Sequence, residues 1–187
     1  SGAGGLTWSN ATFSFGFLYV RTNNPYSGAT AFDGALAILV YTSGGLGDSS
    51  GGTFIGQNVQ CLLQTPMTLN EPITLAGRLD FANGSNAMNA PLTLQGSNLL
   101  LCIPGPRMEF NGPINGSGSL QACGIGTNFY NAGGSFDGAM EIFAGQYMFP
   151  SEFPGTDLLV GGTINFSSTV AGTGRVRSIV ASDAGTN

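Results

Sequence analysis

Short β-prone runs separated by turn residues are the feature that most constrains this chain. The runs are rich in Val, Ile, Leu, Phe and Thr, Gly/Pro/Asn/Ser clusters separate them, and no longer window carries a helical period of about 3.6. The runs lie at 12–20, 35–42, 53–63, 73–81, 91–94, 98–103, 107–110, 117–123, 136–144, 146–149, 157–166 and 174–181. With 31 glycines and 9 prolines disfavouring helices, the sequence predicts an all-β fold, a β-sandwich or jelly roll.

An internal repeat suggests how such a sandwich is organised. Residues 24–38 align without gaps to residues 128–142, and a weaker echo pairs 75–81 with 160–166. In the stronger repeat, seven residues of the first copy are identical to their equivalents in the second: Asn24, Tyr26, Phe32, Asp33, Gly34, Ala35 and Ile38. We read Asp33 and its equivalent Asp137 as turn formers. Because no linker separates the two copies, the repeat predicts two pseudo-repeated halves of a single body.

Charge is scarce in this chain. Charged residues make up 8% of it, the net charge is -5 and the pI is about 4.2, whereas hydrophobic residues reach 42%, enough for a packed core. The basic residues are all arginines and form no phosphate-neutralising cluster, so neither nucleic acid nor an anionic membrane surface is an expected partner. No apolar run approaches the roughly 20 residues of a membrane-spanning helix.

Residues that most catalytic mechanisms require are missing. The chain has no histidine and no lysine, which excludes Ser-His, Cys-His and Schiff-base chemistry. The three cysteines, Cys61, Cys102 and Cys123, match no zinc spacing, so we expect no metal and no cofactor. They are either buried thiols or include one disulfide, for which Cys102 and Cys123 are the candidate pair.

A pair of carboxylates is the one enzymatic route left open, as in glycoside hydrolysis. The candidates are Glu109, Glu141, Glu152, Asp137 and Asp157. Acids scattered in this way more often form turns or solvated surface, and we expect no enzyme activity.

The stretch T-F-S-F-G-F-L-Y-V at residues 12–20 places four rings on alternate positions, Phe13, Phe15, Phe17 and Tyr19. On a strand these rings would share one face. Because the stretch follows a loose leader, S-G-A-G-G, we divide the chain into an N-terminal arm with a candidate donor strand, 1–20, and a β-sandwich body, 21–187. Such a strand can complete the sheet of a neighbouring subunit, or it can be the first strand of its own sandwich.

In this plan the chain resembles the subunits of bacterial and archaeal surface filaments assembled by donor-strand complementation. The resemblance rests on residues 1–20, the all-β remainder and the composition rich in Gly, Ser, Thr and Asn. It concerns the overall organisation of the chain and not a shared sequence motif. It implies a pilus-like structural subunit at the cell surface that polymerises head to tail with copies of itself. Since there is no lysine for isopeptide links, strand exchange, packing or disulfides would hold the polymer.

Four N-x-[ST] sequons add to the expectation of an extracellular protein. They lie at Asn10, Asn83, Asn115 and Asn165, and each is a candidate site for a covalent glycan at the surface.

The alternative function is a secreted carbohydrate-binding β-sandwich that stacks exposed aromatic rings on sugars. The candidate rings are Trp8, Tyr26, Tyr130 and Tyr147. Tyr26 and Tyr130 are equivalent in the repeat, so their exposure can distinguish a sugar-binding protein from one in which these rings are core. Exposure of both on one face would favour sugar binding, whereas burial would make them core.

Overall fold

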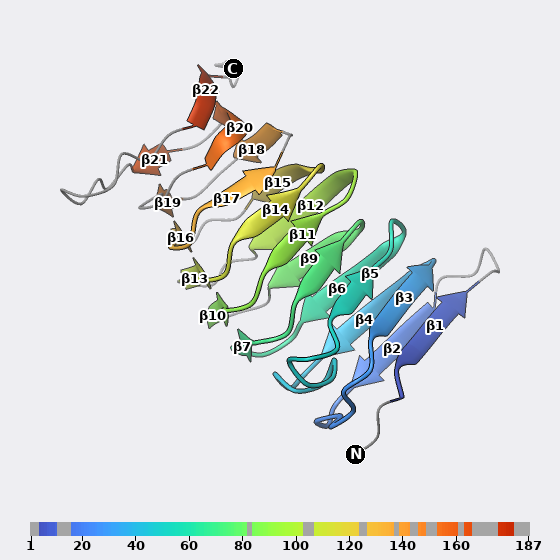
Figure 1. The fold of residues 1–187 in the computed structure, drawn as a ribbon. Coiled ribbons are helices and arrows are strands. Elements are labelled where there is room, and N and C mark those ends of the chain that lie inside the picture. The colour runs from blue at the N-terminus through green and yellow to red at the C-terminus, as the bar shows by residue number, and fades with distance from the viewer. Residues whose placement is uncertain are drawn as a thin grey trace, which may run out of the picture.

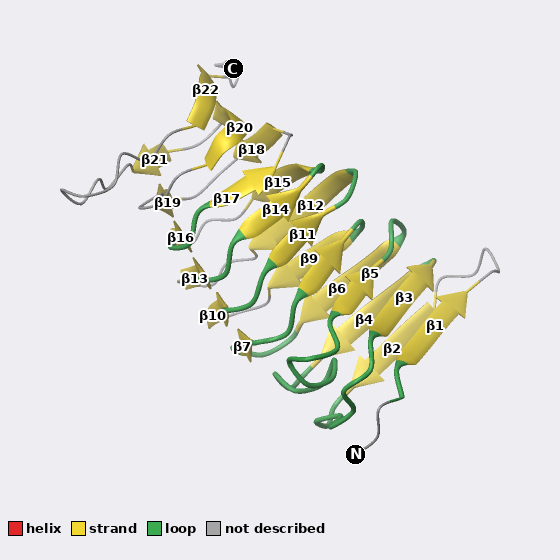
Figure 2. Cartoon of the chain, in the orientation of Figure 1, coloured by secondary structure: helices red, strands yellow, loops and turns green. Residues whose placement is uncertain are grey.

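The protein is a parallel β-solenoid (Figure 1). The computed structural model describes residues 4–10, 16–81, 84–102, 107–123, 127–136, 139–142, 146–148, 153–160, 163–165 and 176–181. These residues form strands and turns and no helix (Figure 2). Every strand pair among them is parallel. The chain is all-β as predicted, but the β-sandwich or jelly roll is wrong, because those architectures are built from antiparallel strands.

Three stacked sheets form the walls of the solenoid. The first sheet runs in the order β1 (Leu6–Asn10), β3 (Thr30–Gly34), β5 (Thr53–Ile55), β8 (Ile73–Leu75), β11 (Leu92–Leu94), β14 (Ile114–Gly116) and β17 (Gly134–Phe136). The second runs β2 (Gly16–Val20), β4 (Leu36–Val40), β6 (Val59–Leu63), β9 (Arg78–Phe81), β12 (Ser97–Cys102), β15 (Ser119–Cys123), β18 (Ala139–Ile142), β20 (Phe153–Val160) and β22 (Val176–Ala181). The third runs β21 (Thr163–Asn165), β19 (Gln146–Met148), β16 (Thr127–Tyr130), β13 (Arg107–Phe110), β10 (Ser85–Met88) and β7 (Thr68–Leu69).

The repeat seen in the sequence is a multiple of the true structural period. In the first sheet each turn places a residue directly on its equivalent in the next, through the column Thr30, Thr53, Ile73, Leu92, Ile114 and Gly134. Those five steps cover the same offset that separates residues 24–38 from residues 128–142. The two copies are therefore segments five turns apart in one solenoid, and the predicted two halves of a sandwich are wrong.

The core is built from columns of like residues that stack from turn to turn. Leu69, Met88, Phe110 and Tyr130 form one column of the third sheet, and all are at most 1% exposed. The rings of Phe110 and Tyr130 stack with centroids 4.8 Å apart and an interplanar angle of 7°. Full burial of each such side chain contributes about 1.5–3 kcal/mol, so the columns dominate the stability of the solenoid.

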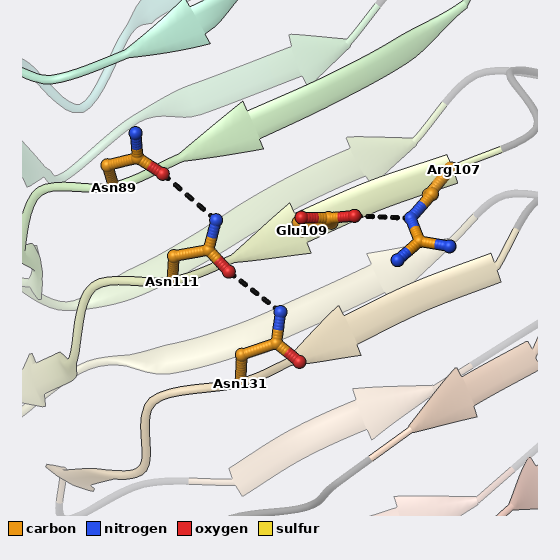
Figure 3. Close-up of polar contacts among 5 residues, drawn as sticks. All are labelled: Asn89, Arg107, Glu109, Asn111 and Asn131. Carbon is orange, nitrogen blue, oxygen red and sulfur yellow. Dashed lines mark hydrogen bonds and ion pairs between the residues drawn. The ribbon is translucent and has the colours of Figure 1, made fainter.

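A ladder of asparagine side chains follows the corner after the third sheet. Asn89 donates from Nδ2 to Asn70 Oδ1 at 2.9 Å, Asn111 donates to Asn89 at 2.9 Å, and Asn131 donates to Asn111 at 2.7 Å. Figure 3 shows the last two bonds. The ladder has a sequence signature, N-E-P, N-A-P, N-G-P and N-A-G, that recurs once per turn.

Close stacking at this corner also restricts the residue after Asn111. A Cβ atom on Gly112 would lie 2.1 Å from the carbonyl oxygen of Ala90 on the previous turn. Glycine is therefore required there, because no side chain fits between the two backbones.

The third sheet begins only at β7, and loops take its place on the two preceding turns. Residues 21–29 and 41–52 form these loops. They stack through the backbone, since the Asn24 N–H donates to Gly44 O at 2.9 Å and the Asp48 N–H donates to Tyr26 O at 3.0 Å. Leu46, which is 1% exposed, fills the core from the second loop. This irregular corner positions the pocket described below.

Candidate functional site

Among the described residues, two side chains in core-facing positions are exposed at one end of the solenoid. Leu6 pairs with Thr30 and Trp8 pairs with Phe32, so both lie in columns that face the core. Thr30 and Phe32 are each 1% exposed, whereas Leu6 is 37% and Trp8 43% exposed. In the described residues no strand pairs with the outer edge of β1 or β2. We call Leu6, Trp8 and the outer edges of β1 and β2 the N-terminal end face.

The aromatic strand predicted as a donor is placed differently. Its strand β2 pairs with β4 of the same chain, with Phe17 opposite Ala37 and Tyr19 opposite Leu39. Donor-strand exchange is therefore wrong for this fold, because the strand already completes the second sheet of its own solenoid. Phe13 and Phe15 lie outside the described residues.

Phe17 and Tyr19 lie on the outer surface of the second sheet. Phe17 is 62% and Tyr19 52% exposed, while Val20 next to them is buried. The guanidinium of Arg21 lies over the rings of Tyr19 and Tyr41, at 5.3 Å and 5.6 Å from their centroids. These rings flank the solenoid and do not belong to the N-terminal end face.

The tyrosines proposed for sugar stacking do not form a common exposed face. Tyr130 is fully buried beneath Phe110, so it belongs to the core. Tyr26 is half-buried, and its hydroxyl lies 2.7 Å from Thr30 Oγ1 and donates to Leu46 O at 3.0 Å. Of the other candidates, Trp8 lies on the N-terminal end face, and Tyr147 is placed on β19.

The predicted carboxylate candidates are distributed over several strands. Glu109 forms an ion pair with Arg107 on β13 (Figure 3). Glu141 lies on β18 and Asp157 on the neighbouring β20, opposite Ala139. Asp137 and Glu152 lie outside the described residues. Within the described part of the chain, no group of three or more His, Cys, Asp or Glu side chains could hold a metal ion.

Cys61 is a free, fully buried thiol, and burial raises its pKa to about 12, with smaller contributions from Asp80 and Glu71. Cys102 and Cys123 end the paired strands β12 and β15, where Leu101 is the residue opposite Cys123. The disulfide between them stays a prediction.

The sequons also stay predictions. Asn10 ends β1, Asn165 ends β21, and Asn115 is half-buried on β14. Asn83 lies outside the described residues.

A pocket that the sequence did not reveal lies at the irregular corner, between residues 41–52 and the turn that joins β7 to β8. Its volume is about 220 Å³. It is lined by Ser43, Gly44, Gly47, Ser49, Asn70 and Glu71. We call it the Glu71 pocket.

Glu71 is the unusual member of this lining. Its side chain is buried, at 4% exposure. Oε1 accepts a hydrogen bond from Thr53 Oγ1 at 2.5 Å, and the buried Oε2 has no partner among the described residues. Burial raises the pKa of Glu71 from 4.5 to about 7; the Thr53 hydrogen bond opposes this shift and the charge of Asp48 adds to it.

Asp48 lies on the loop of residues 41–52, on the other side of the pocket from the turn that carries Glu71, and its environment differs. It is exposed, and its Oδ1 accepts hydrogen bonds from the Ser50 hydroxyl and from the Ser50 N–H, at 2.5 Å and 2.8 Å. These bonds lower the pKa of Asp48. It adds negative potential to the loop that lines the Glu71 pocket.

The described residues define the chain as a parallel β-solenoid, and they include an exposed end face and a polar pocket. A scan against protein-family models found no match, and comparisons with curated proteins and with solved structures found no significant similarity. None of the described segments forms a helix of the length and hydropathy needed to cross a membrane.

Proposed function

We propose that the protein is a structural subunit of an extracellular filament or surface assembly, in which copies stack end to end through their solenoid edges. The observation that carries the proposal is the N-terminal end face, where Leu6 and Trp8 are exposed in columns that are otherwise buried. An uncovered parallel edge with apolar core positions is a template for another strand layer. The occupant we assign to it is a second copy of this chain.

The direction of assembly follows from strand polarity. The second sheet has β2 at one edge and β22 at the other, and the two strands lie at opposite ends of the solenoid (Figure 1). A copy displaced along the axis brings β22 beside β2 in the parallel sense used throughout the sheet. Two N-terminal end faces would instead meet as antiparallel strands. The favoured contact is therefore head to tail, which does not close and builds a filament.

The energetic contribution of the end face can be estimated from exposure. Trp8 keeps 43% of its surface accessible, which is about 100 Å² for a large aromatic residue. Covering that area contributes about 2.5 kcal/mol at roughly 25 cal/mol per Å². Loss of this contact would weaken association by about 50-fold, because each factor of ten corresponds to about 1.4 kcal/mol.

The test compares two aspartate substitutions by light scattering and negative-stain electron microscopy over a concentration series. We expect wild type to form filaments one solenoid wide and Trp8→Asp to remain monomeric with an unchanged circular dichroism spectrum. Phe54→Asp is the matched control, since Phe54 is a half-buried outward-facing residue on β5, which is paired on both sides by β3 and β8 and lies inside the stack. It should assemble like wild type.

Two results would overturn the proposal. One is a wild-type chain that stays monomeric at its highest soluble concentration. The other is assembly that Phe54→Asp abolishes and Trp8→Asp leaves intact, since this would show side-by-side association through the outer surface of the first sheet.

A further inference from the structure

We propose that the Glu71 pocket binds a hard divalent cation of the calcium class, with the Glu71 carboxylate as its anionic ligand. This inference concerns a second site and does not rest on the proposed assembly. The pocket lies between residues 41–52 and the turn that joins β7 to β8, and it is not part of the N-terminal end face.

The lining of the pocket matches the ligand preference of such an ion. Calcium takes six to eight oxygen ligands from carboxylates, carbonyls, amides and waters. The pocket is lined by residues whose hydroxyl, carbonyl, amide or carboxylate groups carry oxygen, namely Ser43, Gly44, Gly47, Ser49, Asn70 and Glu71. Only one of these residues carries a charge, so the site would resemble a weak calcium site, with an affinity of about 0.1–1 mM.

The buried Glu71 carboxylate lacks a counter-charge from the protein. Its Oε2 is buried without a partner among the described residues, although an ionised carboxylate in this environment requires compensation. The chain contains no lysine and no histidine. The arginines whose side chains are described are engaged elsewhere, Arg21 over Tyr19 and Tyr41, Arg78 with Asp80 and Arg107 with Glu109. A bound cation would supply the missing charge.

The size of the pocket fits an ion that keeps part of its hydration shell. A water occupies about 30 Å³, so a pocket of about 220 Å³ has room for a cation and several waters. Those waters would complete the coordination that the protein oxygens begin. The exposed Asp48, on the loop of residues 41–52, adds negative potential, which attracts a cation.

The fold itself does not require an acid at this position. Glu71 is the middle residue of N-E-P, and the equivalent residues on the following turns are Ala90, Gly112 and Ala132. Glu71 differs from these residues in what lies on the preceding turn of the solenoid. Residues 41–52 lie there, whereas Ala90, Gly112 and Ala132 each follow a turn with an N-x-P corner. A departure from the local rule at a pocket indicates a functional position.

The experiment measures calcium binding to the full chain by isothermal titration calorimetry near pH 8, with thermal unfolding as a second readout. We expect saturable binding of about one ion per chain and a Tm that rises with calcium. Glu71→Gln keeps the shape and the hydrogen-bonding capacity of the side chain but removes its charge, and should weaken binding at least tenfold. Glu109→Gln removes an acid on the outer surface of β13 and is the matched control with unchanged affinity.

A third measurement does not depend on the folding of any variant. Because binding requires the ionised carboxylate, wild-type affinity should fall as the pH is lowered from about 8 to about 5.5, with protons released on binding near pH 7. The proposal is overturned if wild type binds no calcium at roughly 10 mM, well above the expected range. It is also overturned if Glu71→Gln binds as tightly as wild type, or if the pocket instead takes up a neutral hydroxylated probe such as glycerol with no response to calcium.

Discussion

Replacing Asn111 by alanine tests whether the asparagine ladder stabilises the solenoid. Asn111 donates to Asn89 Oδ1 at 2.9 Å and accepts from Asn131 Nδ2 at 2.7 Å, so the substitution removes two side-chain hydrogen bonds. A typical intramolecular hydrogen bond contributes about 0.5–1.5 kcal/mol net. The ladder asparagines are exposed, so groups that lose a partner can turn to water and no desolvation penalty is added. We therefore expect a loss of about 1–2 kcal/mol.

The measurement is urea unfolding at 25 °C followed by circular dichroism. Asn70→Ala should cost about half as much as Asn111→Ala, because Asn70 takes part in one ladder bond, as the acceptor from Asn89. Asn58→Ala, an exposed asparagine in the turn before β6, is the control and should stay within about 0.5 kcal/mol of wild type.

A double-mutant cycle separates the ladder from general effects of losing an asparagine. Asn89→Ala and Asn111→Ala each remove two ladder bonds, but they share one, so the double variant should be about 1 kcal/mol less destabilised than the sum of the singles. Strict additivity, together with an Asn111→Ala variant as stable as Asn58→Ala, would show that the ladder contributes nothing measurable.

Three further predictions concern packing and titration. Gly112→Ala should destabilise the protein by at least about 2 kcal/mol in urea unfolding because its Cβ would lie 2.1 Å from Ala90 O, whereas Gly4→Ala, with nothing within 4 Å, should be neutral. Without divalent cations, stability should fall as the pH rises from about 4.5 through about 7, because folded Glu71 holds its proton more tightly than the unfolded chain; a Glu71→Gln variant with the same pH profile would contradict this. Cys61 should resist alkylation at pH 8 in the folded protein and react in urea, as peptide mapping by mass spectrometry can check, because its thiol is buried and its pKa is raised to about 12.

The sequence predicted the strands better than it predicted their pairing. Strand runs such as 35–42 and 73–81 contain β4, β8 and β9, because apolar alternation and turn residues report local structure. Pairing is not local, and the same texture of short strands and glycine-rich turns serves an antiparallel sandwich and a parallel solenoid. The repeat could have decided between them. The repeat was recognised only between segments five turns apart, because identical residues recur there, such as Phe32 and Phe136. Residues of the same column on turns between them, such as Ile55 and Leu75, are apolar but not identical.

The shorter period was present in the sequence as the recurring N-x-P. Its Asn places the ladder at a corner and its Pro ends the turn, so the motif reports geometry at one position of each turn. Identity elsewhere in the turn is relaxed, because a core column needs only an apolar side chain of suitable size. A search for conserved spacing of turn residues, with no demand on the strands between them, would have found the solenoid.

Both candidate sites lie where the regular winding is interrupted, and for the same physical reason. Inside the stack each residue is covered on both sides by equivalents about 20 residues away, so composition there is set by packing. Among the described residues no strand lies beyond β1, and Trp8 keeps an apolar surface that another strand of the column would cover. At residues 41–52 a loop replaces a strand, and the space beside Glu71 holds polar groups instead of a methyl group. Substitutions within the regular turns should therefore change stability alone, whereas changes at Trp8 or Glu71 should alter association or ion binding with little effect on the columns.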